Sequence, residues 1–215
     1  SGATTSRTSK PSVAARDLLQ LPADGGSFSK VALALPLAFA AALAALCLLP
    51  FAQQQTMLTR SMLGAAGFIA AWTGVYFYVA GPRYRDVGLE IVLRKQHYIQ
   101  ACAQFAVMLY WGWYWREVYN SLHLIAAQLL FAYAFDMLLT WSRGQKYAFG
   151  FGPFPIIFSI NLFLWFKPDW FYLQFVMVAV GFLAKAFITW EKDGKRTHIF
   201  NPSSFPLGVF SLGLI

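Results

Sequence analysis

Apolar residues gather into long runs along the chain, and short polar stretches separate these runs. They cover about residues 31–50, 61–80, 98–115, 121–141, 151–166 and 170–190, and a seventh run begins near Phe205. A helix needs about 20 apolar residues to cross a membrane, and its backbone hydrogen bonds must be satisfied within the segment. The pattern therefore predicts an all-α fold, a polytopic helical membrane protein with six complete spans and a partial seventh.

The first 30 residues differ from the rest of the chain because they are rich in Ser, Thr, Ala and Gly and contain no long apolar run. We interpret residues 1–30 as a polar tail and residues 31–215 as one helical transmembrane domain. The first apolar run is longer than the apolar part of a usual signal peptide, so we interpret it as a spanning helix rather than a cleaved leader.

The overall composition agrees with a membrane location. Hydrophobic residues make up 58% of the 215 residues and charged residues only 12%, whereas an average soluble domain has about 25% charged residues. A soluble fold of this size would have to expose much of that apolar surface to water. The composition therefore excludes a disordered chain and a soluble enzyme, and the two cysteines exclude a disulfide-rich scaffold.

Positive charge is distributed unevenly between alternate loops. The tail and the loops 81–97, 142–150 and 191–204 contain four, four, two and three basic residues, so 13 of the 17 lie on one side, and Arg60, Arg116 and Lys167 lie on the other. Cytoplasmic loops are enriched in Lys and Arg, which predicts a cytoplasmic N-terminus. The net charge of +8 then needs no nucleic-acid partner, and anionic lipids on the cytoplasmic side are expected partners.

Two ionisable residues, Asp136 and Lys185, fall inside predicted spans. Each lies five residues before a Trp at the inner end of its span, so both are expected at similar depth. Charges in the hydrocarbon are expensive and usually pair or line a pathway. One interpretation is an ion pair between them; the alternative is that Lys185 extends to the headgroups while Asp136 caps a helix or meets water.

Two predicted helix starts on the cytoplasmic side resemble each other. One reads Gly150-Phe151-Gly152-Pro153-Phe154-Pro155, and the other reads Asn201-Pro202-Ser203-Ser204-Phe205-Pro206. Proline suits a first helical turn, and two helix N-termini that open to the same side favour an anion. Gly152, Pro153, Asn201, Ser203 and Ser204 are therefore candidate cofactor-binding residues, with ordinary turn chemistry as the alternative. The three histidines lie on different segments without metal-ligand spacing, so no metal site is predicted.

The stretch 149–208 resembles the RnfD/NqrB family of membrane subunits from ion-pumping electron-transport complexes. The resemblance rests on Gly150-Phe151-Gly152-Pro153, on Ala184-Lys185-Ala186-Phe187, and on the run from His198 to Phe205; it is closest to the UnbU-like branch. It implies a bacterial inner-membrane location, an all-helical domain, a flavin as cofactor, and Lys185, beside the helix that Asn201 opens, as a sixth candidate cofactor-binding residue. The chain ends inside its seventh run, as expected of a shortened relative or a fragment.

In the pump branch of this family a flavin is attached to a Thr, in a motif similar to Ser1-Gly2-Ala3-Thr4. Here that motif lacks the preceding acidic residue and lies on the predicted cytoplasmic side, so covalent flavin on Thr4 is not expected. The resemblance implies an integral membrane subunit of a multi-subunit electron-transport complex, with other membrane subunits as partners. The alternatives are a non-catalytic accessory subunit of a larger membrane assembly, and a small-solute or ion transporter with Asp136 and Lys185 along its path.

Overall fold

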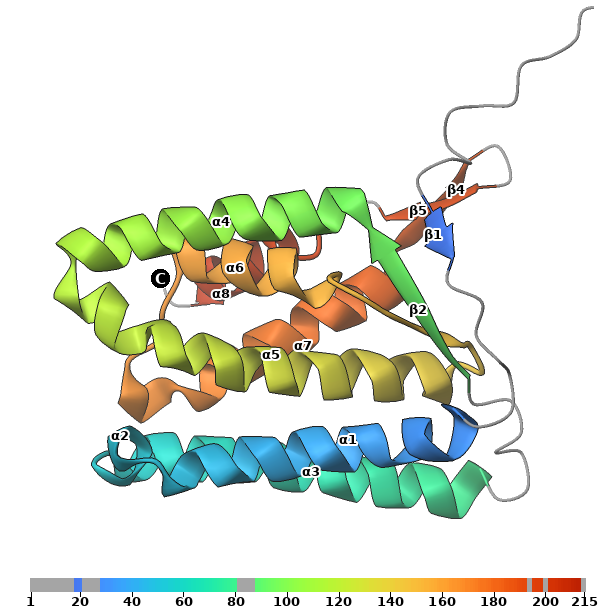
Figure 1. Cartoon of the computed structure of the whole chain (residues 1–215), viewed down its shortest axis with the longest axis horizontal. Helices are drawn as coiled ribbons and strands as arrows, with labels where there is room; N and C mark the ends of the chain where they lie inside the picture. The colour runs from blue at the N-terminus through green and yellow to red at the C-terminus, as the bar shows by residue number, and fades with distance from the viewer. Residues whose placement is uncertain (1–17, 21–27, 81–87, 193–194, 199–200, 214–215) are drawn as a thin grey trace, which may run out of the picture.

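The computed structural model describes residues 18–20, 28–80, 88–192, 195–198 and 201–213. Long helices lie side by side and the shorter ones pack against them (Figure 1). The long helices are α1 (Phe28–Ala45), α3 (Thr56–Ala80), α4 (Lys95–Tyr114) and α5 (Arg116–Ser142), and the shorter ones are α6 (Pro153–Phe163), α7 (Tyr172–Phe187) and α8 (Ser204–Gly213). Short helical turns η2 (Leu46–Leu48), α2 (Pro50–Gln53) and η4 (Pro168–Trp170) connect them. The prediction of a mostly helical fold is confirmed.

Helix length separates the apolar runs into two groups. In the described part of the chain, Thr56–Val79 and Arg116–Ser142 are long and apolar enough to cross a membrane, whereas the apolar helices α6, α7 and α8 are shorter. At about 1.5 Å per residue, the 11 residues of α6 reach roughly half of the 30 Å hydrocarbon thickness. Two candidate spans are therefore present, and the arrangement of six spans stays a prediction.

Several helices begin earlier than the apolar runs suggest. Helix α3 begins at Thr56 and α5 at Arg116, five residues before the predicted starts. Arg60 near the start of α3 and Glu117 near the start of α5 interrupt the apolar pattern, but the backbone is already helical there. Helix ends often contain polar residues because the first four N–H groups need partners other than the helix itself.

The sequence pattern did not predict the short strands. In one sheet, β2 (Leu89–Arg94) pairs antiparallel with β1 (Leu18–Gln20) and parallel with β3 (Tyr147–Phe149). Strands β4 (Thr189–Lys192) and β5 (Lys195–His198) form an antiparallel pair. Figure 1 shows all of them at one end of the helical bundle, where they add to a fold that stays mostly helical.

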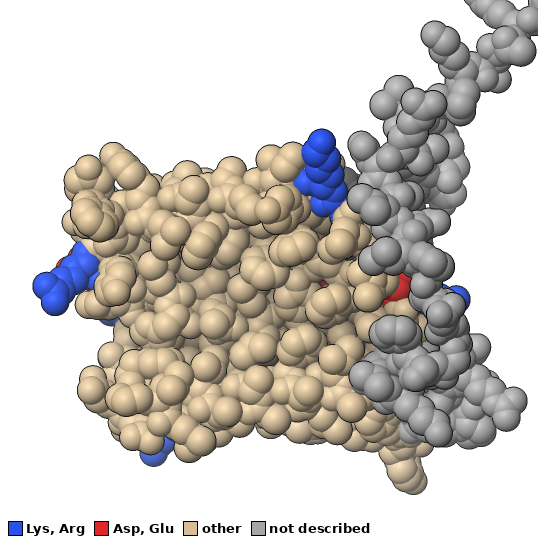
Figure 2. Space-filling view, in the orientation of Figure 1, with Lys and Arg blue, Asp and Glu red and all other residues tan. Residues whose placement is uncertain are grey.

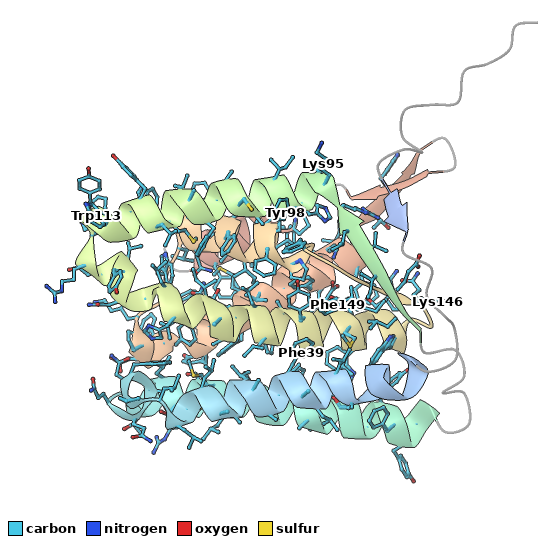
Figure 3. All side chains as sticks on the ribbon, in the orientation of Figure 1. Phe39, Lys95, Tyr98, Trp113, Lys146 and Phe149 are labelled. Atoms are coloured by element: carbon cyan, nitrogen blue, oxygen red, sulfur yellow. The ribbon has the colours of Figure 1, made fainter. Side chains whose placement is uncertain are left out.

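The strands and the turns between helices lie at opposite ends of the bundle. The described strands β2 to β5 lie at one end, and the turns that join α1 to α3, α4 to α5 and α6 to α7 lie at the opposite end (Figure 1). Lys95 and Lys146 lie at the strand end, whereas Trp113 lies at the far end of α4 (Figure 3). Between the ends, Figure 2 shows a broad face on which Lys, Arg, Asp and Glu atoms are nearly absent.

Helix α5 forms the centre of the core, and most of its residues from Leu124 to Leu139 are buried. Three buried amides join it to its neighbours: Gln128 of α5, Asn161 of α6 and Gln174 of α7. Gln128 Nε2 donates to Asn161 Oδ1 at 3.0 Å, and Asn161 Nδ2 donates to Gln128 Oε1 at 2.7 Å. Gln174 Nε2 donates to both at 3.3 Å, so the three helices share one polar contact in an otherwise apolar core.

Candidate functional site

Asp136 of α5 and Lys185 of α7 form an ion pair near the strand end of the bundle. Lys185 Nζ lies 3.3 Å from Asp136 Oδ2, and the side chains are 30% and 13% exposed, respectively. Nζ also lies 5.2 Å from the centre of the Phe182 ring, a distance at which a cation is attracted to the ring face. The structure therefore shows the ion pair, which is one of the two interpretations of these charges.

A close approach between α7 and the segment before α8 brings Asn201 and Pro202 beside Lys185. A Cβ atom at Gly181 would lie 2.7 Å from the carbonyl oxygen of Pro202, so only glycine leaves room for that segment. The Asn201 side-chain oxygen accepts hydrogen bonds from the backbone N–H and the hydroxyl of Ser203, at 3.2 and 2.9 Å. This cap fixes the chain at the start of α8.

The parallel pairing of β2 with β3 brings the start of α4 beside the start of α6. Ile91 pairs with Phe149 in this register, so β2 continues into α4 where β3 leads into α6. The Tyr133 ring lies between Phe39 and Phe149, at centroid distances of 5.8 and 5.2 Å. Its hydroxyl donates to the carbonyl oxygen of Gly150 at 2.7 Å, which fixes the turn before α6.

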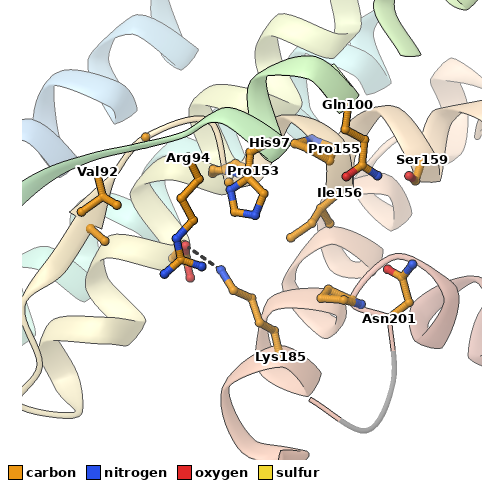
Figure 4. Close-up of a pocket in the computed structure, with 15 residues that line it drawn as sticks. Val92, Arg94, His97, Gln100, Pro153, Pro155, Ile156, Ser159, Lys185 and Asn201 are labelled. Carbon is orange, nitrogen blue, oxygen red and sulfur yellow. Dashed lines mark hydrogen bonds and ion pairs between the residues drawn. The ribbon is translucent and has the colours of Figure 1, made fainter. Parts of the chain in front are cut away.

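These contacts enclose a cavity of about 530 Å³, within the usual range of ligand sites. Figure 4 shows Arg94 and Lys185 reaching toward the same part of this cavity, with Gln100 and Ser159 at another side. We name it the first cavity, and its lining consists of Val92, Arg94, His97, Gln100, Asp136, Ala148, Gly150, Gly152, Pro153, Pro155, Ile156, Ser159, Lys185, Asn201 and Pro202. It combines cations, neutral hydrogen-bonding groups and apolar side chains.

Four of the six predicted binding residues meet at the first cavity: Gly152, Pro153, Lys185 and Asn201. Ser203 and Ser204 do not line it. Ser203 is buried and bonded to Asn201, and Ser204 is exposed at the first position of α8. Their role in binding stays a prediction.

Sequence reasoning missed Arg94, His97, Gln100 and Ser159. The short run Leu89–Arg94, which contains the β-branched residues Ile91 and Val92, is a strand signal that would have placed Arg94 at the end of a strand. No local pattern shows that this strand pairs with β3, however, and it is that pairing that brings Arg94 and His97 to the start of α6. The contribution of α4 to the cavity therefore depends on tertiary structure.

The electrostatics of the first cavity favour an anion. Arg94 and Lys185 contribute two positive charges against the single carboxylate of Asp136. Burial lowers the pKa of His97, and the nearby charges of Arg94 and Lys185 lower it further, so the imidazole is neutral at pH 7 and can act as donor or acceptor. Helix α6 opens toward the cavity with Pro153 in its first turn, and a helix N-terminus attracts negative charge.

A neutral polar pair lies on the side of the first cavity near Gln100. Gln104 Nε2 donates to Ser159 Oγ at 2.7 Å, which leaves the Ser159 hydroxyl hydrogen free to donate to a bound molecule. The Oε1 atom of Gln104 is buried and has no hydrogen-bond partner among the described residues. Gln104 itself does not line the first cavity, so the Ser159 hydroxyl is the group of this pair that suits a ligand carbonyl.

Other candidate sites are less well supported. Among residues 28–80, 88–192, 195–198 and 201–213, no group of three His, Cys, Asp or Glu side chains could hold a metal ion. Thr4 lies outside the described residues.

No protein-family model matches the chain, and neither the curated proteins nor the solved structures include a significant match.

Proposed function

We propose that the protein is an integral membrane subunit of a multi-subunit electron-transport complex similar to the RnfD/NqrB family. In this proposal the first cavity holds an anionic cofactor at the cytoplasmic end of the bundle. The observation that carries the proposal is that α4, α6, α7 and the start of α8 meet at one cavity with Arg94 and Lys185 in its lining. Four residues in the stretch that resembles that family belong to this lining: Gly152, Pro153, Lys185 and Asn201.

The surface supports a membrane location for this proposal. Large apolar side chains are widely exposed on α3 and α4, including Val75 at 60%, Tyr78 at 90% and Trp113 at 86%. Apolar patches of this extent on soluble proteins mark interaction or membrane surfaces. Charged atoms lie toward the ends of the face in Figure 2, as expected when the hydrocarbon surrounds the middle of the bundle.

A flavin nucleotide matches the residues of the first cavity. Its phosphate suits Arg94 and Lys185, because charge-assisted hydrogen bonds to phosphate are strong. Its ring carbonyls suit the donors of Gln100 and Ser159, which line the cavity. When bound, a flavin would supply one- and two-electron transfer; the chain itself would hold and orient it and exclude water.

A titration with riboflavin 5′-phosphate, followed by quenching of flavin fluorescence, tests this assignment on protein purified in mild detergent. We expect Arg94→Gln to weaken binding about ten-fold, because a hydrogen bond to a charged group contributes roughly 1.5–3 kcal/mol. Arg116→Gln, at the opposite end of the bundle, is the matched control and should leave binding unchanged. If the wild type neither carries a flavin absorption band nor quenches added flavin, the cofactor assignment is wrong.

The accessory-subunit alternative is favoured by the exposed side of α3. In the most apolar stretch of α3 only 28% of the residues are buried, whereas in the corresponding stretch of α5 67% are buried. Gly64, Gly67 and Gly74 are exposed there, and no heavy atom lies within 4 Å of an added Cβ. Small residues on an open face let another membrane helix pack closely. Blue-native electrophoresis that shows a free monomer only would contradict this alternative.

A further inference from the structure

A second cavity of about 220 Å³ adjoins the Asp136–Lys185 ion pair. It shares Asp136, Lys185 and Ala148 with the first cavity. It lies where α5 ends and where α7 approaches its last turn, at the end of the bundle that bears the strands. This second cavity is lined by Asp136, Leu139, Thr140, Arg143, Gln145, Lys146, Tyr147, Ala148, Phe182, Lys185 and Ala186. Of the six predicted binding residues, Lys185 alone belongs to it.

Positive charge is in excess around the second cavity. Arg143, Lys146 and Lys185 line it together with a single carboxylate, Asp136, and that carboxylate is paired with Lys185. Within the part of the chain that the structure describes, neither Arg143 nor Lys146 is in an ion pair. Glu90 faces Ala148 in the pairing of β2 with β3, but it does not line the cavity. Two cations are therefore available to an incoming anion.

Local contacts hold these two cations in place. The Arg143 guanidinium carbon lies 5.5 Å from the centre of the Phe187 ring. The side chain of Lys146 lies so close to Gly88 that an added Cβ there would be 2.8 Å from Lys146 Cγ. An arginine that stacks on an aromatic ring loses less freedom when it binds a ligand, because part of its entropy is already lost.

Cations at the end of a helix often serve only to neutralise its last carbonyl groups. Here backbone groups already satisfy two of the last carbonyls of α5. The oxygen of Thr140 accepts from the N–H groups of Arg143 and Gln145, both at 3.2 Å, and the oxygen of Trp141 accepts from Gly144 at 2.8 Å. Gly144 has a φ of 66°, the left-handed conformation with which helices commonly end. The two side-chain cations are therefore not needed as caps for α5.

Tyr147 supplies an independent indication of a ligand. Its side chain lines the second cavity and is 2% exposed, and its hydroxyl has no hydrogen-bond partner among the described residues. Burial raises its pKa well above the usual value, with smaller contributions from Asp136 and Tyr133, so the hydroxyl stays protonated and remains a donor. A buried hydroxyl without a partner is unfavourable, and an anion that enters the cavity would accept its hydrogen bond.

We propose that the second cavity binds a phosphate group between Arg143, Lys146 and the hydroxyl of Tyr147. The phosphate of an anionic lipid headgroup fits its position, because basic pockets between membrane helices on the cytoplasmic side bind such headgroups. Leu139, Phe182 and Ala186 form the apolar part of the cavity wall, next to which the glycerol of a lipid would lie. A free phosphate has the same chemistry, so the test separates the two sources. Only the lipid source rests on the membrane location proposed above.

The lipid source is tested in nanodiscs made from phosphatidylcholine with a small fraction of phosphatidylglycerol. Native mass spectrometry of the released protein measures which lipid stays bound. We expect retained phosphatidylglycerol in the wild type and about ten-fold less in Arg143→Gln/Lys146→Gln, from the loss of charged hydrogen bonds. Tyr147→Phe removes only the hydroxyl and should weaken retention by a smaller factor. Arg60→Gln/Arg116→Gln, at the opposite end, is the matched control and should retain the lipid.

Free phosphate is tested by the shift that inorganic phosphate causes in the thermal unfolding midpoint of the delipidated protein in neutral detergent. A shift in the wild type that the double variant lacks, without retained phosphatidylglycerol, supports the site and assigns it to soluble phosphate. Arg143→Lys/Lys146→Arg keeps both positive charges and should keep phosphate binding. If Arg143→Gln/Lys146→Gln does not fold, Tyr147→Phe serves as the binding-deficient variant in its place. Arg94→Gln should weaken flavin binding in the first cavity and leave phosphate binding in the second cavity unchanged. The two proposals can therefore be contradicted independently. The proposal is overturned if neither phosphatidylglycerol nor inorganic phosphate distinguishes the wild type from Arg143→Gln/Lys146→Gln or from Tyr147→Phe.

Discussion

Lys185 Nζ lies 3.3 Å from Asp136 Oδ2, although the two residues are 49 positions apart in the chain. This ion pair joins α7 to α5 and lies in the lining of both the first and the second cavity. Because the Lys185 side chain remains 30% exposed, the pair fixes its position without removing it from a ligand. The carboxylate of Asp136 therefore acts as a positioning group for the cation that both cavities share.

Removal of one member of this pair should destabilise the fold. Asp136→Asn leaves Lys185 without its partner, and we expect the free energy of unfolding to fall by about 2 kcal/mol. This is less than the roughly 3–5 kcal/mol expected for a fully buried pair, because solvent screens the partly exposed lysine. The measurement is reversible unfolding in mixed micelles. Asp136→Asn/Lys185→Gln should recover part of the loss, and strictly additive effects of the two changes would show that the pair contributes nothing.

The contact between Gly181 and Pro202 is the second target. Gly181→Ala would place a Cβ atom 2.7 Å from the Pro202 carbonyl oxygen, so the segment before α8 must move away from α7. We expect a loss of about 1–3 kcal/mol from overpacking, together with weaker ligand binding in the first cavity. Gly208→Ala has open space around the new methyl group and should be neutral or stabilise by up to about 1 kcal/mol. Equal effects at the two positions would contradict the close approach.

The amides in the core predict a third effect. Asn161→Leu leaves Gln128 and Gln174 without their shared partner, and each buried amide that loses its hydrogen bond costs about 1–3 kcal/mol. We expect thermal unfolding of the variant in detergent to shift clearly to lower temperature. Ser121→Ala removes an exposed bond within α5 and should change stability by less than about 0.5 kcal/mol. An unfolding midpoint for Asn161→Leu within that range would show that the amide cluster is dispensable.

The environment of His97 predicts a loss of stability in acid. Burial, then Arg94 and then Lys185 lower its pKa from the usual 6.5, so the unfolded chain takes up this proton first as the pH falls. The contribution of neutral His97 to the free energy of unfolding is fully present above about pH 6.5, and it is lost as the pH falls from there through the lowered native pKa. Asp136 also lines the cavity, where it is paired with Lys185. Unfolding midpoints from pH 8 to pH 5 should fall more steeply for the wild type than for His97→Gln; parallel curves would exclude this role.

The helices and the ion pair could be anticipated from the sequence because both depend on local periodicity and residue counts. Apolar runs predicted the helices, and the equal spacing of Asp136 and Lys185 from the inner ends of their spans predicted their equal depth. The first turns of α3 and α5 were missed because Arg60 and Glu117 interrupt the apolar pattern without interrupting the helix. The strands were missed because β2 pairs with β3 across more than 50 residues of chain.

The candidate site was anticipated only in part for the same reason. Two similar helix starts indicated Gly152, Pro153 and Asn201, and the resemblance added Lys185. Arg94 and His97 reach the first cavity through strand pairing, and Arg143 and Lys146 were interpreted as topology signals alone. A count of charges per loop shows on which side a cation lies, but whether it has a partner depends on tertiary contacts.

The central claim is that the first cavity binds an anionic cofactor within a larger membrane complex. Its most direct test is native mass spectrometry of the solubilised protein, with an absorption spectrum of the same sample, for the wild type and Arg94→Gln. We predict a mass greater than that of the chain alone, with partner subunits and a bound flavin, and loss of the flavin mass and its absorption band in the variant. A bare monomer of 24.1 kDa with no visible absorption would contradict the claim.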